Sequence, residues 1–563
     1  MVTRKKYLGE MLLESGTISH EQLQEALDIQ KQSENKRLGV ILKELGYVDE
    51  SKIMKVLESQ LGIPFIDLAH TSIAPEMSQY VPINIARRHM LVPVSVKDGV
   101  INIAMEDPFS FLAIDDVRMV SHMDVQPMLA RAKEISHAID VLYGNQFAEK
   151  ALEDLSKEYN LDKIVADLNE ETDIGVGSAP IVRLVNSLIE QAVKNGASDI
   201  HIEPLENEIR IRTRIDGVLS QTLDASIQLL PSIIARIKIM GNMNIAEKRI
   251  PQDGRAQLNV LGHKVDIRIS TMPTVNGEKA VMRLLDRSSF LRPKSELGFT
   301  RENLELFDRL MQNPNGIILI TGPTGSGKST TLYTMLNELN RESDNIITVE
   351  DPVEYMMEGL NQVNVNVKAG LTFPVALRSI LRQDPDIIMI GEIRDRETVD
   401  IAIRAAITGH LVLSTIHTND AASTISRLMD MGVEPFMLSA SIVGIIAQRL
   451  VRKICPVCKH AVQLTDYQLK YIGLDTNAKY KFYEGSGCAN CSNTGYKGRI
   501  AVHEIMVIDR NHRDMISQSA PADKLRDYSF KTGMRTLKNE CVRLLLDGVT
   551  TIDEVFKVAY TEE

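Results

Sequence analysis

The sequence predicts an α/β multidomain protein built around a phosphate-binding loop. With 563 residues, the chain is too long for one hydrophobic core and has room for roughly three to five domains. Residues 322–329 fit the pattern G-x-x-x-x-G-K-[ST], between a short apolar run and a helical stretch. Three later apolar runs each end in polar residues, as strands do in a parallel sheet with a site at its carboxyl edge.

Changes of pattern along the chain divide it into five segments. The predicted segments are a helical repeat at 1–62, a small α+β domain at 63–145, a charged linker at 146–178, an arginine-bearing α+β domain at 179–292, and the nucleotide domain at 293–563 with a cysteine-bearing insert at 451–500.

Composition and charge exclude several classes of protein. Apolar residues make up 44% and charged residues 25% of the chain, which is ordinary for a soluble globular protein. The net charge of −11 argues against nucleic-acid binding as the main role. No apolar run approaches the ~18 residues of a membrane span, and no apolar signal core follows residues 1–6. We therefore expect a cytoplasmic protein that touches membranes only through partners.

Residues 1–62 contain an internal repeat at an offset of 30 residues. The matching positions are Leu8, Gly9, Leu12, Gly16, Leu23, Leu27 and Gln30 in the first copy and Leu38, Gly39, Leu42, Gly46, Ile53, Leu57 and Gln60 in the second. Each copy predicts a helix, a turn at its second glycine, and another helix. The apolar positions have helical spacing, so the two helix pairs can pack on each other without any ligand.

This repeat resembles the tandem motif of the MshE N-terminal (MshEN) domain, a family that binds cyclic di-GMP. The resemblance implies ligand contacts from Arg37, Leu38, Gly39, Leu8, Gly9, Gln30 and Gln60. The second copy has the Arg-Leu-Gly start of the family, whereas Tyr7 replaces the arginine of the first copy. A guanidinium group can stack on a guanine or hydrogen-bond to it, but a tyrosine cannot offer the planar fork. Cyclic di-GMP binding and a helical packing module are both open interpretations.

Residues 63–145 predict a small α+β domain. Residues 91–105 read as two strands joined at Asp98-Gly99, which is typical of a hairpin. Helical stretches follow at about 111–120 and 131–143. The highly charged residues after this segment predict a linker with some helix.

Residues 179–292 begin with an amphipathic helix and continue with strands in which charged residues alternate with apolar ones. Arg210, Arg212 and Arg214 share one face of a predicted strand, where they are either functional or simply solvated. Arg255 follows Asp253-Gly254, which we interpret as a turn. Phosphate-loop enzymes often use arginines from outside the nucleotide domain to offset charge on the transferred phosphoryl group. Arg255 and Arg268 are the candidates for that role.

The nucleotide domain carries the phosphate loop between a predicted strand at 316–320 and a predicted helix at 329–340. Backbone N–H groups and the helix N-terminus would surround a triphosphate. Lys328 would reach the β- and γ-phosphates, and the Ser329 hydroxyl would bind Mg²⁺. The residues assigned to ATP and Mg²⁺ are Gly322, Pro323, Thr324, Gly325, Ser326, Gly327, Lys328, Ser329 and Thr330.

Three further strands are predicted at 345–349, 387–390 and 411–415. Each ends in polar residues, so carboxylates and a histidine should meet at one edge of the sheet. One carboxylate can activate or orient the attacking water, and another can hold the Mg²⁺ shell. His417 could sense the γ-phosphate.

Residues 322–330, 350–355, 381–395 and 409–418 resemble the Walker A, Asp, Walker B and His boxes of the secretion ATPase (GspE/PilB) superfamily. The resemblance spans nearly the whole chain. It implies a hexameric ATPase with a RecA-like motor domain preceded by a PAS-like α+β domain. By motif position it implies that Glu354 is the catalytic carboxylate and Glu392 the Walker B carboxylate. His410 and His417 would be the His-box residues, and Arg255 and Arg268 would act from the preceding domain.

Four of the five cysteines form two C-x₂-C pairs, Cys455/Cys458 and Cys488/Cys491, with 29 residues between them. Two such pairs supply four thiolates for a tetrahedral zinc ion, which would be structural because no ligand position stays open. Redox-active thiols are the weaker alternative. Cys541 has helical spacing with nearby leucines and is expected in a core.

The resemblance further implies a PilB-like extension motor of type IV pili. Such a motor would do mechanical work on an inner-membrane platform protein (PilC/GspF-like), with other cytoplasmic pilus components as further possible partners. Two alternatives stay open: a GspE-like type II secretion motor, and a cyclic-dinucleotide-regulated scaffold with weak ATPase activity. The intact Lys328, Ser329, Glu354 and Glu392 argue against the scaffold.

Overall fold

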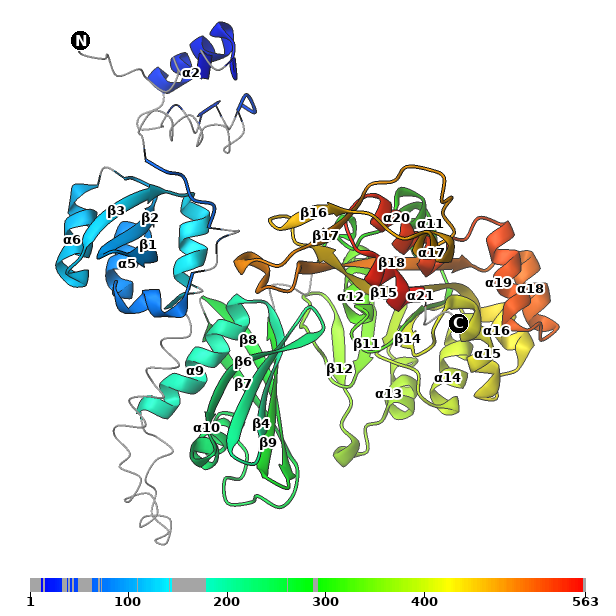
Figure 1. Ribbon diagram of the computed structural model, residues 1–563. Helices are drawn as coiled ribbons and strands as arrows, with labels where there is room; N and C mark the ends of the chain where they lie inside the picture. Colours follow the sequence, from blue (N-terminus) through cyan, green and yellow to red (C-terminus); the bar gives the residue numbers. More distant parts are fainter. Residues whose placement is uncertain are drawn as a thin grey trace. The chain divides into compact units, whose positions relative to one another are not determined.

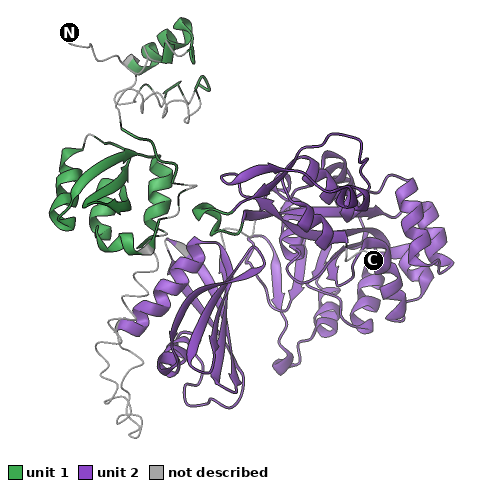
Figure 2. Cartoon of the chain, viewed as in Figure 1, with its two compact units in different colours: residues 1–170, 487–494 green, residues 171–486, 495–563 purple. Residues whose placement is uncertain are grey.

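The computed structural model describes most of the chain (Figure 1). The described residues are 12–13, 16–32, 38, 41–42, 45–48, 63–68, 71, 73–108, 110–140, 142–143, 179–260, 262–286 and 292–559. They belong to two compact units, residues 1–170 with 487–494 and residues 171–486 with 495–563 (Figure 2). The predicted linker lies outside the described residues. No described helix is both long and apolar enough to cross a bilayer.

The described part of the N-terminal repeat has a small apolar core. Buried residues of both copies form one cluster, namely Leu12, Ile18, Ala26, Ile41, Leu42 and Val48. Gly16 and Gly46, the predicted turn glycines, have φ values of +66° and +72°, which favour glycine. The helix that follows the first turn is α2 (His20–Gln32). The turns and the shared core therefore match the predicted repeat.

The first unit also contains a three-stranded sheet of order β1-β2-β3. Its strands are β1 (Leu91–Lys97), β2 (Val100–Met105) and β3 (Asp124–Leu129), and its named helices are η1 (Pro75–Gln79), α5 (Ile83–His89) and α6 (Phe111–Ser121). β1 and β2 are antiparallel, and β2 and β3 are parallel. Asp98 and Gly99 turn the chain between β1 and β2 with positive φ, so the predicted hairpin is confirmed.

The second unit starts with α9 (Ala179–Lys194), after which Gly196 ends the helical turn with a φ of +69°. A six-stranded antiparallel sheet of order β6-β5-β4-β9-β8-β7 follows. Its elements are β4 (Ala197–Pro204), β5 (Glu208–Ile215), β6 (Val218–Ser226), η2 (Ile227–Leu229), α10 (Leu230–Met240), β7 (Gln252–Val260), β8 (His263–Thr274) and β9 (Gly277–Asp286).

The expected turn at Asp253-Gly254-Arg255 is wrong, because these residues lie inside β7. A Cβ atom on Gly254 would lie 2.4 Å from the Gly241 carbonyl oxygen. The glycine therefore permits a close approach of two backbone segments and does not serve a turn.

A seven-stranded sheet of order β12-β11-β13-β14-β10-β15-β18 forms the nucleotide domain. Its strands are β10 (Gly316–Thr321), β11 (Ile346–Glu350), β12 (Asn361–Asn364), β13 (Ile387–Ile390), β14 (Leu411–Ile416), β15 (Ile442–Ile454) and β18 (Tyr496–Val507). Neighbours from β12 to β15 are parallel, and β18 is antiparallel to β15. The carboxyl ends of the parallel strands therefore share one edge.

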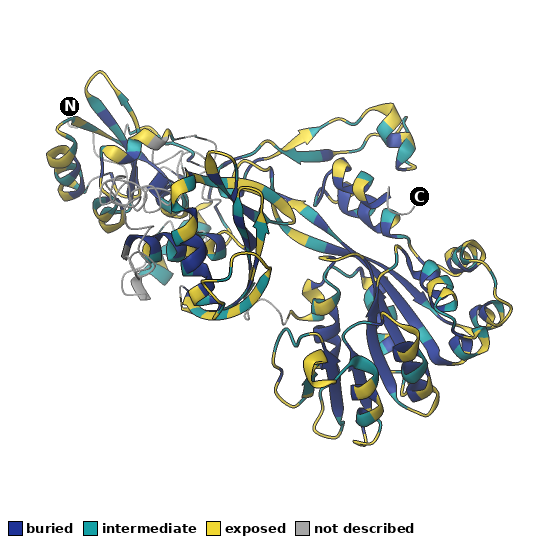
Figure 3. Cartoon of the chain, turned by 90° about the horizontal axis from the view of Figure 1, so that it is seen from below, coloured by how far each residue is buried: buried dark blue, intermediate teal, exposed yellow. Residues whose placement is uncertain are grey.

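Helices cover both faces of this sheet, and its strands are among the most buried segments (Figure 3). Alternate residues of β10 enter different cores: Ile317 packs with α13 and α14, and Ile318 packs with α11 and α12. The helices of this part are η4 (Lys294–Glu296), α11 (Arg301–Met311), α12 (Lys328–Leu339), η5 (Val367–Ala369), α13 (Phe373–Ile380), α14 (Arg396–Ile407), α15 (Ala421–Asp430) and α16 (Pro435–Ser441). Burial on both faces explains the continuous apolar runs in the sequence.

The C-terminal part adds small elements beyond β15. They are β16 (Lys459–Val462), α17 (Asp466–Tyr471), β17 (Phe482–Gly485), η6 (Ala489–Cys491), α18 (Arg510–Ser517), α19 (Ala522–Lys531), α20 (Leu537–Leu546) and α21 (Ile552–Ala559). Cys541 lies in α20 and is fully buried, as predicted. The α/β multidomain class is confirmed, and each sheet falls within one predicted segment, although the segment boundaries themselves stay predictions.

Candidate functional site

The phosphate loop joins the end of β10 to the start of α12. Gly325 and Gly327 have φ values of +80° and +89°, which favour glycine. A Cβ atom on Gly322 would lie 2.5 Å from the Gln448 carbonyl oxygen, and one on Gly327 would lie 2.8 Å from Gln448 Nε2. Glycine is needed at these positions because of their positive φ values or because a Cβ atom would clash with Gln448. The predicted strand, loop and helix are present in this order.

The Lys328 ammonium group bends back onto its own loop. Its Nζ donates to the carbonyl oxygens of Gly322 at 2.8 Å and Pro323 at 3.1 Å. The pKa of Lys328 is lowered to about 8, chiefly by burial; Glu392 opposes the shift and the Arg449 guanidinium adds to it. The lysine is thus a partly desolvated cation for which a phosphate would be a better partner than carbonyl groups.

Glu354 and two arginines of the preceding domain line one cleft. Arg268 in β8 donates from Nη1 to Glu354 Oε1 at 3.1 Å and from Nη2 to Oε2, a bidentate pair. Arg255 in β7 is the cross-strand partner of Arg268. Both arginines and Glu354 line a cleft of about 510 Å³. The structure therefore brings the predicted arginines to the predicted catalytic carboxylate, across the domain boundary.

Glu392 follows β13 at the same sheet edge as the phosphate loop. Its Oε1 pairs with the Arg394 guanidinium, and its Oε2 lies 3.6 Å from His417 Nε2. His417 follows β14, the strand next to β10. This edge thus collects Lys328, Glu392 and His417, as the strand ends predict. Arg394 was not predicted.

His410 does not join this group. It immediately precedes β14, whereas His417 immediately follows it, so about 20 Å of strand separates the two histidines. His410 Nδ1 lies 2.8 Å from the Ala405 carbonyl oxygen, and the His410 carbonyl accepts from the N–H of Gly316 at the start of β10. Within one chain, His410 therefore lies at the sheet edge opposite the phosphate loop, and its His-box role stays a prediction.

Arg210, Arg212 and Arg214 are not simply solvated. Arg212 Nη2 lies 2.8 Å from Glu203 Oε2, and Arg210 Nε lies 3.5 Å from the same atom. Arg214 Nε lies 3.6 Å from Asp199 Oδ2. Burial opposes ionisation of Glu203, but bonds from Arg212 and Lys279 outweigh it and hold its pKa at about 2. These arginines belong to an ion-pair network on the sheet surface.

Gln448 in β15 is a site residue that the sequence analysis missed. Its Nε2 donates to the Ser326 carbonyl at 2.9 Å, and its Oε1 accepts from Thr331 Oγ1 at 2.7 Å. Gln448 is 2% exposed and clamps the loop to the first turn of α12. The next residue, Arg449, is also buried and donates to the Asn419 carbonyl at 2.7 Å. In the sequence, the adjacent polar pair Gln448-Arg449 inside an otherwise apolar strand could have pointed to a buried functional role.

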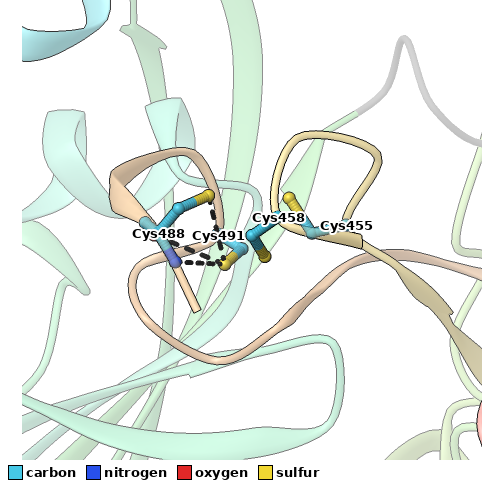
Figure 4. A group of neighbouring side chains, drawn as sticks. All are labelled: Cys455, Cys458, Cys488 and Cys491. Carbon is cyan, nitrogen blue, oxygen red and sulfur yellow. Dashed lines mark hydrogen bonds between the residues drawn. The ribbon is translucent and has the colours of Figure 1, made fainter. Parts of the chain in front are cut away.

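The four cysteines of the insert come together. Their sulfur atoms all lie within 4.8 Å of one another, and all four residues are buried (Figure 4). Two loops supply one C-x₂-C pair each, and Cys488 Sγ lies 3.7 Å from Cys491 Sγ. Zn–S bonds of about 2.3 Å in a tetrahedron require sulfur atoms about 3.8 Å apart, so this donor set fits zinc. All five cysteines are described, and no disulfide joins them.

The residues between the two pairs fold locally, as expected for the long spacing. β16 and β17 form an antiparallel pair, and α17 lies between them in sequence. The N–H of Cys455 donates to the Gly495 carbonyl at 3.0 Å. A Cβ atom on Gly485, the last residue of β17, would lie 2.1 Å from the Gly495 carbonyl oxygen, so β17 and the segment that leads into β18 approach each other through glycine.

A family model described as Type II/IV secretion system protein matches residues 175–557. The chain belongs to this family. It is an ATPase of the group that serves type IV pilus assembly and type II secretion, and the suspected family is thereby confirmed.

Two curated relatives align over nearly the full length. The Type IV pilus assembly ATPase PilB of Myxococcus xanthus is 41% identical over 97% of this chain and 98% of its own. The Type II secretion system protein E of Xanthomonas campestris pv. campestris is 41% identical over 98% of this chain and 97% of its own. The solved ATPase DotB of Yersinia pseudotuberculosis shares the fold, with a TM-score of 0.50 and 21% identity over 67% of this chain and 93% of that chain.

A second family model, the MshEN domain, matches residues 61–149. The match therefore falls on the segment predicted as a separate α+β domain. It leaves out residues 1–60, which hold the repeat and all the residues assigned to cyclic di-GMP. Of the residues assigned to cyclic di-GMP, Gln30 and Leu38 are described. The others lie outside the described residues, namely Leu8, Gly9, Arg37, Gly39 and Gln60.

Proposed function

We propose that the chain is a hexameric, cytoplasmic motor ATPase that assembles type IV pili. It works on an inner-membrane platform protein (PilC/GspF-like), through which it associates peripherally with the membrane. The observation that best supports a motor is the cleft in which Arg268 of the preceding domain binds Glu354 of the nucleotide domain. Because Glu354 is bound by an arginine of another domain, a change at Glu354 during hydrolysis would move that domain. The Myxococcus relative, aligned over 97% of this chain, supports pilus assembly.

The proposed roles follow from position. Glu354 accepts a proton from the attacking water, and Lys328 and the loop amides hold the β- and γ-phosphates. Ser329, Thr330 and Glu392 are the residues that would hold Mg²⁺, which offsets phosphate charge when bound. His417, beside Glu392, would sense the γ-phosphate.

Arg268 and Arg255 would offset charge on the transferred phosphoryl group. Because Arg268 is paired with Glu354 here, it has to exchange that carboxylate for the phosphate during turnover. The six-stranded sheet that carries both arginines must then shift relative to the nucleotide domain. This exchange is the proposed source of mechanical work.

The N-terminal region would add regulation by cyclic di-GMP. The MshEN match covers residues 61–149, and the 30-residue repeat before it supports placing the ligand contacts in residues 1–60. Arg37 would contact a guanine, and Gly9 and Gly39 would let the backbone approach the ligand. Calorimetry with cyclic di-GMP on the full chain, with Arg37→Ala as the comparison, tests it.

Glu354→Gln tests the motor assignment. The amide keeps the shape of the side chain but cannot act as a base, so we expect ATP binding to persist and turnover to fall by about 10²–10⁴-fold. In cells that lack the native gene, the wild-type chain should restore surface pili and the variant should not. Normal ATP turnover by the variant would reject the role of Glu354. Restored secretion without pili would reject pilus assembly.

A further inference from the structure

A tyrosine in the helix that begins at the phosphate loop hydrogen-bonds to the backbone of the loop that carries Glu354. Tyr333 lies in α12, five residues after Lys328, and is 1% exposed. Its hydroxyl oxygen accepts from the backbone N–H groups of Glu354 at 3.1 Å and Tyr355 at 3.3 Å. The same hydroxyl donates to Glu350 Oε2 at 2.5 Å. One phenol group thus connects the helix that begins at the phosphate loop to the backbone of the proposed catalytic residue.

Glu350 and Gln362 complete this polar cluster. Glu350, at the end of β11, is 4% exposed and accepts from Thr348 Oγ1 at 2.7 Å and from Gln362 Nε2 at 3.3 Å through its second oxygen. Gln362 also donates to the Tyr355 carbonyl at 2.9 Å and accepts from the Met357 N–H at 2.7 Å.

The cluster fixes four backbone groups between residues 354 and 357. Such a loop would otherwise be free to move, because it joins two strands at the edge of the sheet and has Met356 71% exposed. The Tyr333 hydroxyl is suited to this task, since its one proton and two lone pairs are all used. Its ring also stands edge-on to the Tyr355 ring, with centroids 6.4 Å apart.

We propose that the Tyr333 hydroxyl is a positioning group for ATP hydrolysis. It sets the distance between the Glu354 carboxylate and the phosphates held by the loop at the start of its own helix. Tyr333 touches no reacting atom, so its effect passes through Glu354, and this inference rests on the proposed catalytic role of Glu354. Gln362 has the same effect through the Tyr355 carbonyl and the Met357 N–H group.

Tyr333→Phe is the direct test, because it removes one oxygen atom and leaves the ring packing intact. A displacement of about 1 Å in a catalytic group can cost on the order of 10²-fold in rate, so we expect kcat to fall about 10- to 100-fold. KM and equilibrium affinity for ATP should stay within about twofold, since the phosphate loop is unchanged. Gln362→Leu should show the same split between kcat and KM.

Tyr143→Phe is the matched control. Tyr143 is also 1% exposed, and its hydroxyl donates to the Val81 carbonyl at 2.6 Å in the first unit. This variant loses a buried hydroxyl far in sequence from the site, so its kcat should equal that of the wild type. Thermal unfolding of both variants separates a loss of folded protein from a loss of rate.

A double variant distinguishes positioning from general destabilisation. In a Glu354→Gln background the group that Tyr333 positions is gone, so adding Tyr333→Phe should reduce kcat no further. An unchanged kcat in Tyr333→Phe, or a loss that multiplies that of Glu354→Gln, would overturn the proposal. Wild-type turnover in Glu354→Gln alone would instead refute the role of Glu354, which is a separate result.

Discussion

Lys328 should take up a proton when ATP binds near pH 8. Burial lowers its pKa from the ordinary 10.5 to about 8, so roughly half of the lysine is neutral at pH 8 and roughly a tenth at pH 7. A γ-phosphate beside Nζ favours the ammonium form and raises this pKa. Binding should therefore take up about half a proton at pH 8 and about a tenth of a proton at pH 7.

Calorimetry with a non-hydrolysable ATP analogue and Mg²⁺ measures this uptake. The heat of binding is recorded at pH 8 in two buffers with different enthalpies of ionisation, and the difference gives the number of protons. Lys328→Arg is the matched control, because a guanidinium group stays protonated at this pH. Equal heats in both buffers for the wild type, or the same uptake in Lys328→Arg, would refute the reasoning.

The same pKa sets the sign of a stability effect. Burial disfavours the charged form of Lys328 in the folded state, whereas the unfolded chain keeps its ordinary preference for the ammonium form. Between pH 8 and 10.5 the unfolded chain binds more protons at Lys328 than the folded chain does. The contribution of this residue to the free energy of unfolding therefore rises with pH across that window, and its burial penalty is complete below pH 8.

Three further variants test other parts of the site. Arg268→Ala should lower kcat with little change in ATP affinity, because the arginine acts on Glu354 and the transferred phosphoryl group; an unchanged kcat in steady-state assays would leave it a structural ion pair. Cys455→Ser with Cys458→Ser should remove bound zinc and loosen the insert before the ATPase core. Hydrogen exchange and metal analysis check this, and a metal-free wild type would contradict it. Gln448→Leu should cost about 1–3 kcal/mol of stability by leaving the buried Ser326 carbonyl unpaired and should raise KM for ATP, as thermal unfolding and kinetics would show.

The sequence predicted the phosphate loop well because its determinants are local. The apolar run of β10, the glycines and Lys328 lie within about a dozen residues, and each is needed for its own conformation or charge. The bidentate contact of Arg268 with Glu354 joins residues 86 positions apart, and only tertiary structure reveals it. The same applies to Gln448, which clamps a loop more than 100 residues before it.

The expected turn at 253–255 and the expected meeting of His410 with His417 fail for the same reason: a short stretch of sequence does not show how a strand runs. Asp253-Gly254 has the composition of a turn, but Gly254 is needed where β7 passes the Gly241 carbonyl. His410 and His417 are close in sequence, but β14 lies between them. A motif that spans a whole strand necessarily places its two ends at opposite edges of the sheet.

Under the proposed mechanism, the pairing of Arg268 with Glu354 couples the two domains. In the cleft, Arg255 and Arg268 are cross-strand neighbours, so their like charges need an anion between the domains. Glu354 supplies that anion in this arrangement, and both of its oxygens face the Arg268 guanidinium. A γ-phosphate carries more charge than a carboxylate and would compete for the arginines. Under the proposed mechanism, release of Glu354 for catalysis and movement of the arginine-bearing sheet would then be one event.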